Sequence, residues 1–206
     1  MQDAHVKNWS PDSHVSAEML ESMRELNHRF LDLVAIPSSN WNSSRCAGLS
    51  AEVSRQVAPL SAAQKRAAAN CPYALFDLRF HDDGHWQTRL RTAGRWSVAD
   101  DTSTDDDTRN FVRLALFFAW HVASTATLAA RFLLGMNEVT AAAFRAATID
   151  CLPALAGTEA ANLTARWNNC PMYWSALTGA ASRPNSAALR RIQLYGLQIA
   201  AAAHLS

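Results

Sequence analysis

The segment HDDGH, residues 81 to 85, is the strongest candidate for chemistry in the sequence. His81, Asp82, Asp83 and His85 place two imidazoles and two carboxylates side by side, and such groups bind divalent metals or relay protons. The same residues have the composition of a polar Asp-Gly turn, and the second half of the chain has NNCPMYW in the matching place. We therefore favour a solvated turn and keep a metal site as the alternative.

Basic side chains that could contact DNA or a protein partner cluster in two places. One group lies in QTRLRTAGRW and the other in the last predicted helix; the residues are Arg89, Arg91, Arg95, Arg190 and Arg191. Trp86 and Trp96 flank the first group, and arginines beside aromatic rings contact phosphates and stack on bases. The ordinary alternative is a solvated surface.

Motifs typical of enzymes are missing from the sequence. It contains no GxSxG elbow, no glycine-rich phosphate loop and no HExxH pair, so we predict no catalytic residue, no cofactor and no enzymatic activity. The formal net charge of +1 gives no field that would attract nucleic acid unaided. DNA binding would need a local patch or a partner.

The composition predicts a mainly helical cytoplasmic protein. Apolar residues make up 49% of the 206 residues and charged residues 18%, as in globular chains. The four cysteines form no CxxC or Cys/His zinc pattern, and the first residues do not resemble a signal peptide. Residues 114 to 130 are apolar enough to raise a membrane span, but His121 and several hydroxyls favour a buried helix, and we predict no membrane contact.

Helical periodicity and capping residues define the elements of the first half. Met19, Met23, Leu26 and Phe30 recur at helical spacing, with Ser16 as a cap and Pro37 as a stop. A polar loop follows at 38 to 44, and Ser50 and Ser61 then cap two short helices. The alternating residues of ALFDLRF predict a short strand or extended arm; they are Phe76, Leu78 and Phe80.

The second half repeats this order at a constant offset of 87 positions. Residues 48 to 80 and 135 to 167 both open with Gly and close with Arg and an aromatic residue. In this register Asn137 replaces Ser50 as a cap and Thr148 replaces Ser61. Arg79 matches Arg166, and we expect both arginines to stabilise the fold by binding carbonyls or acids. Caps and apolar positions kept in one register indicate a duplication.

Two further helices complete the prediction. A helix from 111 to 134 leads into the second copy, and one rod there would finish the first copy and begin the second. The chain closes with a helix over residues 186 to 205, whose predicted apolar face contains Leu189, Ile192, Tyr195 and Ile199. The predicted units are 1 to 108 and 109 to 206.

These motifs resemble FlhD, the D subunit of the bacterial flagellar master transcription regulator. The resemblance rests on ELNHRFLDLVA (25 to 35), the Gly turn, two short capped helices and LRF, and on FLLGMNE (132 to 138) in the second copy. It implies a small helical unit that forms an intertwined dimer and acts with a zinc-containing, DNA-contacting FlhC subunit. Two tandem copies would form a pseudo-dimer within one chain, with at most short β segments. The family's intersubunit cysteine falls at Phe76 and Leu163, so that disulfide is unavailable here.

Three functions follow as hypotheses. The first is a non-enzymatic activator subunit that works through a protein partner at promoters. The second is a helical adaptor or structural module without DNA binding, and the third is a metal-dependent enzyme built on HDDGH. Homo-oligomers are compatible with all three.

Overall fold

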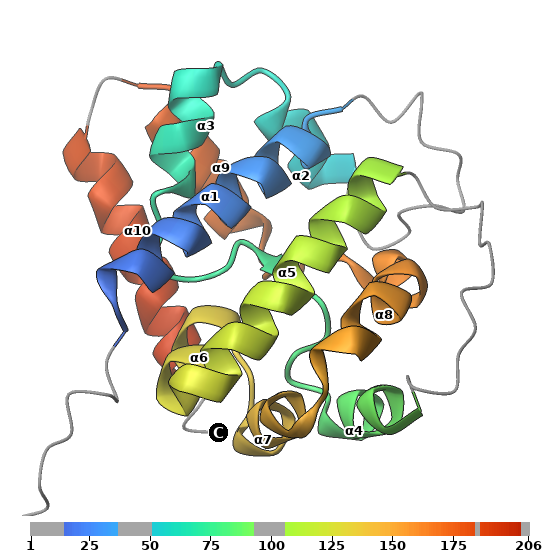
Figure 1. The fold of residues 1–206 in the computed structure, drawn as a ribbon. Coiled ribbons are helices and arrows are strands. Elements are labelled where there is room, and N and C mark those ends of the chain that lie inside the picture. The colour runs from blue at the N-terminus through green and yellow to red at the C-terminus, as the bar shows by residue number, and fades with distance from the viewer. Residues whose placement is uncertain (1–14, 37–50, 93–105, 184–185, 203–206) are drawn as a thin grey trace, which may run out of the picture.

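The computed structural model describes residues 15–36, 51–92, 106–183 and 186–202, and it is mainly helical (Figure 1). The helices are α1 (Ala17–Val34), α2 (Ala51–Val57), α3 (Ala62–Ala69), α4 (Asp83–Thr92), α5 (Asp106–Thr125), α6 (Thr127–Leu134), α7 (Glu138–Ala146), α8 (Leu152–Glu159), α9 (Pro171–Ala181) and α10 (Ser186–Ala202). Two 3-10 turns flank α8, at Ile149–Cys151 and Ala160–Asn162. The strands β1 (Phe76–Asp77) and β2 (Thr164–Ala165) form the sheet.

Capping residues begin the helices largely as predicted. The Ser16 hydroxyl accepts from the backbone N–H of Met19 at the start of α1. Ser61 and Gln64 form a reciprocal capping box on α3, and the side chain of Asn137 caps α7. Thr148 makes no capping bond with its side chain, so that part of the prediction is wrong. Ser50 and Gly48 lie outside the described residues.

The predicted rod from 111 to 134 is wrong, because the helix breaks at Ala126. Its φ of −151° and ψ of 83° separate α5 from α6. The hydroxyls of Thr125 and Thr127 donate to the carbonyls of His121 and Ala123, four residues back in each case. Such bonds compete with the helical ladder and bend helices. Since α5 begins at Asp106, it also crosses the predicted boundary between residues 108 and 109.

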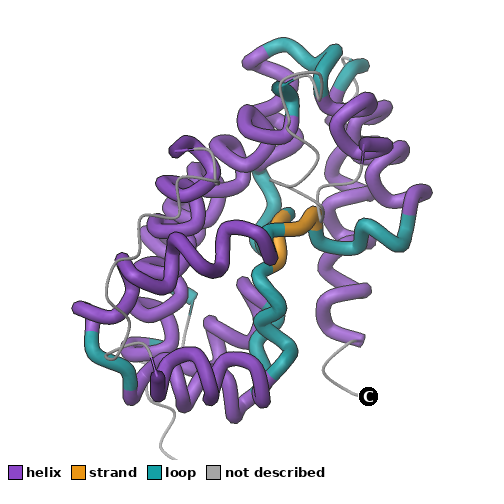
Figure 2. Tube along the Cα trace, turned by 90° about the vertical axis from the view of Figure 1, so that its right-hand side faces the viewer, coloured by secondary structure: helices purple, strands orange, loops and turns teal. Residues whose placement is uncertain are grey.

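The two strands are shorter than predicted and lie at the centre of the molecule (Figure 2). They pair antiparallel, with Phe76 opposite Ala165 and Asp77 opposite Thr164. The extended stretch ends early because Arg79 has a left-handed φ of 57°, which turns the chain. Leu78 and Phe80 are nevertheless buried, so the predicted alternation marks a buried turn rather than a longer strand.

Two turns of the same design follow the strands, and we call them the first and second tryptophan turns (residues 78–86 and 166–174). In the first, the Trp86 indole N–H donates to the Leu78 and Arg79 carbonyls, both at 3.1 Å. In the second, the Trp174 indole N–H donates to the Arg166 backbone carbonyl at 2.9 Å. Both turns contain a left-handed residue that is not glycine, Arg79 in the first and Trp167 in the second.

The offset between these two turns is 88, not 87. Trp174 follows Trp86 by 88 positions, and Trp167 follows Arg79 by the same number. The two tryptophan turns therefore do not follow the predicted offset of 87. Arg79 and Arg166, which match in sequence, do not occupy equivalent places in the fold.

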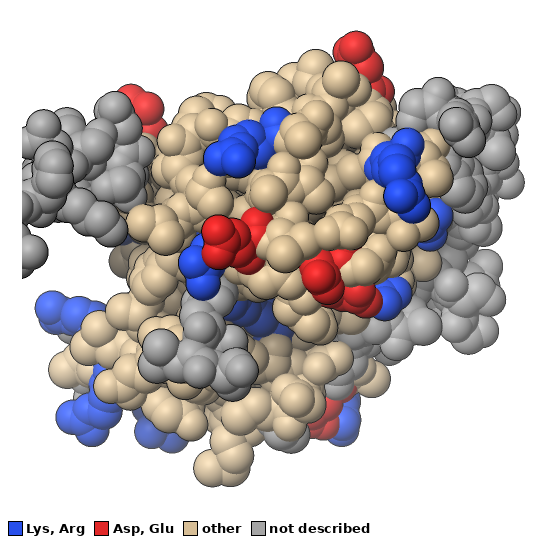
Figure 3. Space-filling view, turned by 90° about the horizontal axis from the view of Figure 1, so that it is seen from below, with Lys and Arg blue, Asp and Glu red and all other residues tan. Residues whose placement is uncertain are grey.

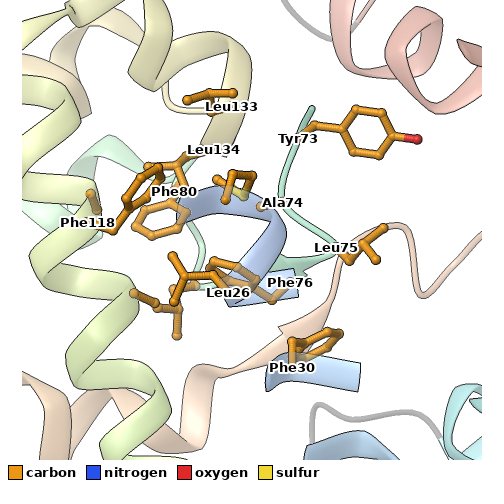
Figure 4. Packing of buried hydrophobic residues seen from close by; sticks show 14 of the residues in the cluster. Leu26, Phe30, Tyr73, Ala74, Leu75, Phe76, Phe80, Phe118, Leu133 and Leu134 are labelled. Atoms are coloured by element: carbon orange, nitrogen blue, oxygen red, sulfur yellow. The ribbon is translucent and has the colours of Figure 1, made fainter. Parts of the chain in front are cut away.

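An aromatic core lies where the two halves meet. Phe76 packs against Phe30 of α1 and Phe111 of α5, with ring centroids 5.9 and 5.1 Å apart. Figure 4 shows that the side chain of Tyr73 points away from Phe76 and Phe30. The Asn27 amide, also buried, donates to the Tyr73 carbonyl at 2.8 Å and accepts from the Leu75 N–H. This single side chain satisfies the backbone that leads into β1.

Contacts between the halves are reciprocal. Helix α4 packs against α7, and α9 packs against α2. Helices α1 and α5 run in roughly the same direction in Figure 1 and contact each other. In each half, the helix at the end of the tryptophan turn therefore packs against the other half.

Helix α10 covers α9 with only part of its predicted apolar face. Leu189, Ile192 and Ile199 pack against the core, but Tyr195 is 49% exposed, which corrects the prediction for that residue. Within the described ranges no single helix is long and apolar enough to cross a membrane; α7 and the 149–162 segment reach that apolarity only as a pair bent by 100°.

Candidate functional site

The HDDGH segment starts α4 instead of forming one cluster. Asp82 caps the helix, because its Oδ1 accepts from the His85 backbone N–H at 2.9 Å, and its other oxygen pairs with Arg79. The His85 hydrogen bond, followed by Arg79, lowers the pKa of Asp82. His81 is 74% exposed on the turn, with its Nδ1 3.7 Å from Asp77.

The preferred interpretation of HDDGH, a solvated turn, is wrong for His85. Its side chain is only 12% exposed, and its Nε2 lies 2.8 Å from Oε2 of Glu159, a fully buried carboxylate at the end of α8. Arg89 approaches Oε1 of Glu159 at 2.9 Å, and Asn162 donates to Oε2 at 2.7 Å. A buried carboxylate requires an opposite charge and hydrogen-bond donors, and Arg89 supplies the charge while Asn162 supplies a donor. We call Glu159, His85, Arg89 and Asn162 the α4–α8 polar cluster.

The metal interpretation of HDDGH finds no ligand set. Among the residues that the structure describes, no group of three or more His, Cys, Asp or Glu side chains lies close enough to hold a metal ion. The two imidazoles diverge, His81 toward Asp77 and His85 toward Glu159. Asp82 is used as a cap.

The four candidate arginines that the structure describes do not form one surface. Arg89 lies in the α4–α8 polar cluster, and Arg91 is exposed beside a groove between α4 and α7. Arg190 and Arg191 are exposed on α10. Arg95 lies outside the described residues.

Acidic and basic side chains are mixed on part of one face of the molecule. On the face shown in Figure 3, most Asp and Glu side chains lie beside Lys or Arg. On α1, Arg24 lies 3.1 Å from Glu21 and Arg29 lies 2.9 Å from Glu25. Where charges of opposite sign lie side by side, their fields largely cancel at a distance.

A second polar cluster, not found from the sequence, lies between the residue 71–73 segment and α10. The Tyr73 and Tyr173 hydroxyls are 3.0 Å apart, and the Tyr73 hydroxyl donates to the Gln193 carbonyl. Burial raises the pKa of the Cys71 thiol to about 12 and raises the pKa of both tyrosines. A thiol protonated at neutral pH is a poor nucleophile, so this cluster is suited to packing.

Gly196 is the one sequence signal that marks this tyrosine cluster. A Cβ at Gly196 would lie 2.1 Å from the Tyr73 hydroxyl oxygen. A glycine inside an otherwise strong helical pattern often indicates such a close approach. We call Cys71, Tyr73, Tyr173, Gln193 and Gly196 the tyrosine cluster.

Arg166 forms the link between the predicted Gly turn and the Arg-aromatic ending. Gly135 has a left-handed φ of 74°, and a Cβ there would lie 2.5 Å from an Arg166 guanidinium nitrogen. The same guanidinium donates to the Leu133 carbonyl and stacks over Trp167 at 5.0 Å. Burial lowers the pKa of Arg166, an effect that Asp77 opposes. Arg166 thus binds a carbonyl and Arg79 an acid, as expected.

Comparison with known proteins gives no neighbour for this chain: no family model, curated protein or solved structure matches it.

Proposed function

We propose that the chain is a non-enzymatic regulatory subunit resembling FlhD. Two tandem helical units form a pseudo-dimer within one polypeptide, and the pseudo-dimer acts at promoters through a separate protein partner. The resemblance in sequence supplies the biological role, and the packing of the two halves supplies the physical argument.

The observation that carries the proposal is the reciprocal exchange of helices. Helix α4 of the first half packs on α7, and α9 of the second half packs on α2. The two strands pair antiparallel about their common centre, and each half has a tryptophan turn closed by an indole-to-carbonyl bond. Two intertwined subunits joined end to end would have these contacts, because a two-fold interface uses the same surface twice.

Joining the copies has a direct energetic benefit. Two free subunits lose translational and rotational freedom on association, and a covalent link removes much of that cost. The link also lets the two copies diverge, since they no longer need to be identical. We therefore expect light scattering of the purified chain to give the mass of a monomer.

Partner-dependent DNA binding is the second part of the proposal. The net charge is +1, and Arg89 is engaged by Glu159, so the chain alone should bind DNA weakly. The tagged chain would be isolated from its source cells with its partner and incubated with fragmented genomic DNA at about 50 and about 200 mM salt. Retention at the lower salt with the partner present, and loss at the higher salt, is expected. A purified complex that retains no DNA at low salt would overturn the proposal.

A helical adaptor without DNA binding is the second candidate. Leu194 and Tyr195 are exposed on α10, at 62% and 49%, and exposed apolar side chains mark protein contact sites when they gather. Identification of secretion or envelope components in the isolated complex, in place of transcription proteins, would favour this candidate.

A further inference from the structure

A groove between α9 and α10 has an apolar floor and two basic residues on its rim. Its volume is about 300 Å³, and it is lined by Ala176, Gly179, Ala180, Ile192, Arg183 and Arg191, among others. Both arginines are exposed. In the part of the chain that the structure describes, neither guanidinium forms an ion pair or a side-chain hydrogen bond.

The chain supplies no acidic side chain from this region. Residues 160 to 206 contain four arginines and not one Asp or Glu. Helices α2 and α3 also pack against α9, but Glu52 of α2 pairs with Arg55, and Lys65 of α3 pairs with Asp32. Among the described residues no acidic side chain pairs with Arg183 or Arg191, so their charge is available to a ligand of opposite charge.

The face continues along α10 with residues typical of protein interfaces. Leu194 and Tyr195 follow Arg191 by three and four positions, so they share its side of the helix. Arginine and tyrosine are enriched where interfaces are energetically strongest. A groove of about 300 Å³ is at the small end for enclosing a whole ligand, and it suits the anchoring side chains of a larger partner.

We propose that this α9–α10 face binds an acidic amphipathic segment of a protein partner. Apolar side chains of the segment would enter the groove over Gly179 and Ile192, and its carboxylates would pair with Arg183 and Arg191. The inference rests on the proposed function only in that both require a protein partner, and it identifies the chemistry of the partner's contact.

The test uses the full chain and a defined probe. The probe is a labelled amphipathic helical peptide with leucine at helical spacing and glutamate beside each leucine; a second peptide has lysine in place of glutamate. Fluorescence anisotropy should show the glutamate peptide binding about tenfold more tightly than the lysine peptide. The double variant R183E/R191E should lose that preference and favour the lysine peptide.

A matched double variant controls for net charge and folding. R113E/R145E makes the same change at exposed positions on α5 and α7, and it should bind the glutamate peptide like the parent. Both variants should keep the parent circular dichroism spectrum and melting temperature. Equal loss in the two double variants, or no loss in R183E/R191E, would overturn the inference.

Three outcomes separate this inference from binding of nucleic acid and from the proposed function. Duplex DNA that binds the parent but not R183E/R191E, with no binding of the glutamate peptide, would assign the face to nucleic acid and overturn the inference. If R183E/R191E still captures its partner and retains DNA in the complex, the proposed function holds and the inference fails. If the peptide preference is found but the native complex never retains DNA, the inference holds and the proposed function fails.

Discussion

The two tryptophan turns share an indole-to-carbonyl hydrogen bond and a left-handed residue, but they differ in their surroundings. Trp86 packs between Phe80 and Phe144, with ring centroids at 5.8 and 4.7 Å, and its turn presents Arg79 to solvent. Trp174 lies between Phe30 and Tyr173, with ring centroids at 6.5 and 5.9 Å. The arginine of its turn, Arg166, is buried.

Comparing the two turns shows which of their features recur and which differ. The indole-to-carbonyl bond and the left-handed residue recur at a spacing of 88, whereas the identical arginines have opposite environments. Arg79 is exposed and pairs with Asp82, and Arg166 is buried over Trp167. In both turns a buried carbonyl needs a hydrogen-bond donor. The arginine of each turn has no such shared requirement, so one is exposed and the other is buried.

Replacing the tryptophans should have the largest effect. Trp86→Ala and Trp174→Ala each remove a fully buried ring and leave a carbonyl without its donor, so each should lower the free energy of unfolding by about 3–5 kcal/mol. Urea unfolding at neutral pH measures the loss. A cost below about 1 kcal/mol for either variant would show that its turn does not hold the fold.

The second largest effect is expected at the α4–α8 polar cluster. This cluster contacts the first tryptophan turn through His85. Glu159→Ala leaves Arg89 and His85 without their buried partner. Breaking a buried pair costs about 3–5 kcal/mol, but Arg89 is 28% exposed and can reach water, so we expect about 2–3 kcal/mol. Glu21→Ala breaks an exposed pair with Arg24 and should cost less than about 0.5 kcal/mol. Equal costs would mean that the cluster adds no stability.

Local signals predicted most of the helices. Caps and apolar spacing depend on neighbours within one or two turns, and they found α1, α3, α7 and α10 close to their observed bounds. The break at Ala126 was missed because the threonine bonds that cause it are compatible with helical periodicity.

Signals that depend on distant contacts were not readable in the same way. His85 looks like a turn residue until Glu159 is placed 74 positions away, and Tyr73 meets Tyr173 across 100 positions. The one-residue change in offset also needs the structure, since identity favours Arg79 with Arg166 whereas hydrogen bonding favours Trp86 with Trp174.

A smaller effect should follow from the close contact beside the second turn. Gly135→Ala places a Cβ against Arg166 at a left-handed φ, and we expect a loss of about 2 kcal/mol in the free energy of unfolding. Gly157→Ala is the matched control: nothing lies within 4 Å of its Cβ, and alanine inside a helix should add about 0.5–1 kcal/mol. The same sign for both variants would contradict this account.

Alkaline pH should distinguish the tyrosine cluster, which lies beside the second turn only, by a graded loss of stability. Burial raises the pKa of Cys71 from 9.0 to about 12, so above pH 9 the unfolded chain releases a proton that the folded chain retains. The thiol therefore contributes fully below pH 9, and its contribution falls by up to about 1.4 kcal/mol per pH unit until pH 12. Cys71→Ala should reduce this slope between pH 9 and 10, and part of it should remain because burial also raises the pKa of Cys151. Parallel stability curves for the parent and Cys71→Ala would show that the Cys71 thiol is not shielded from water.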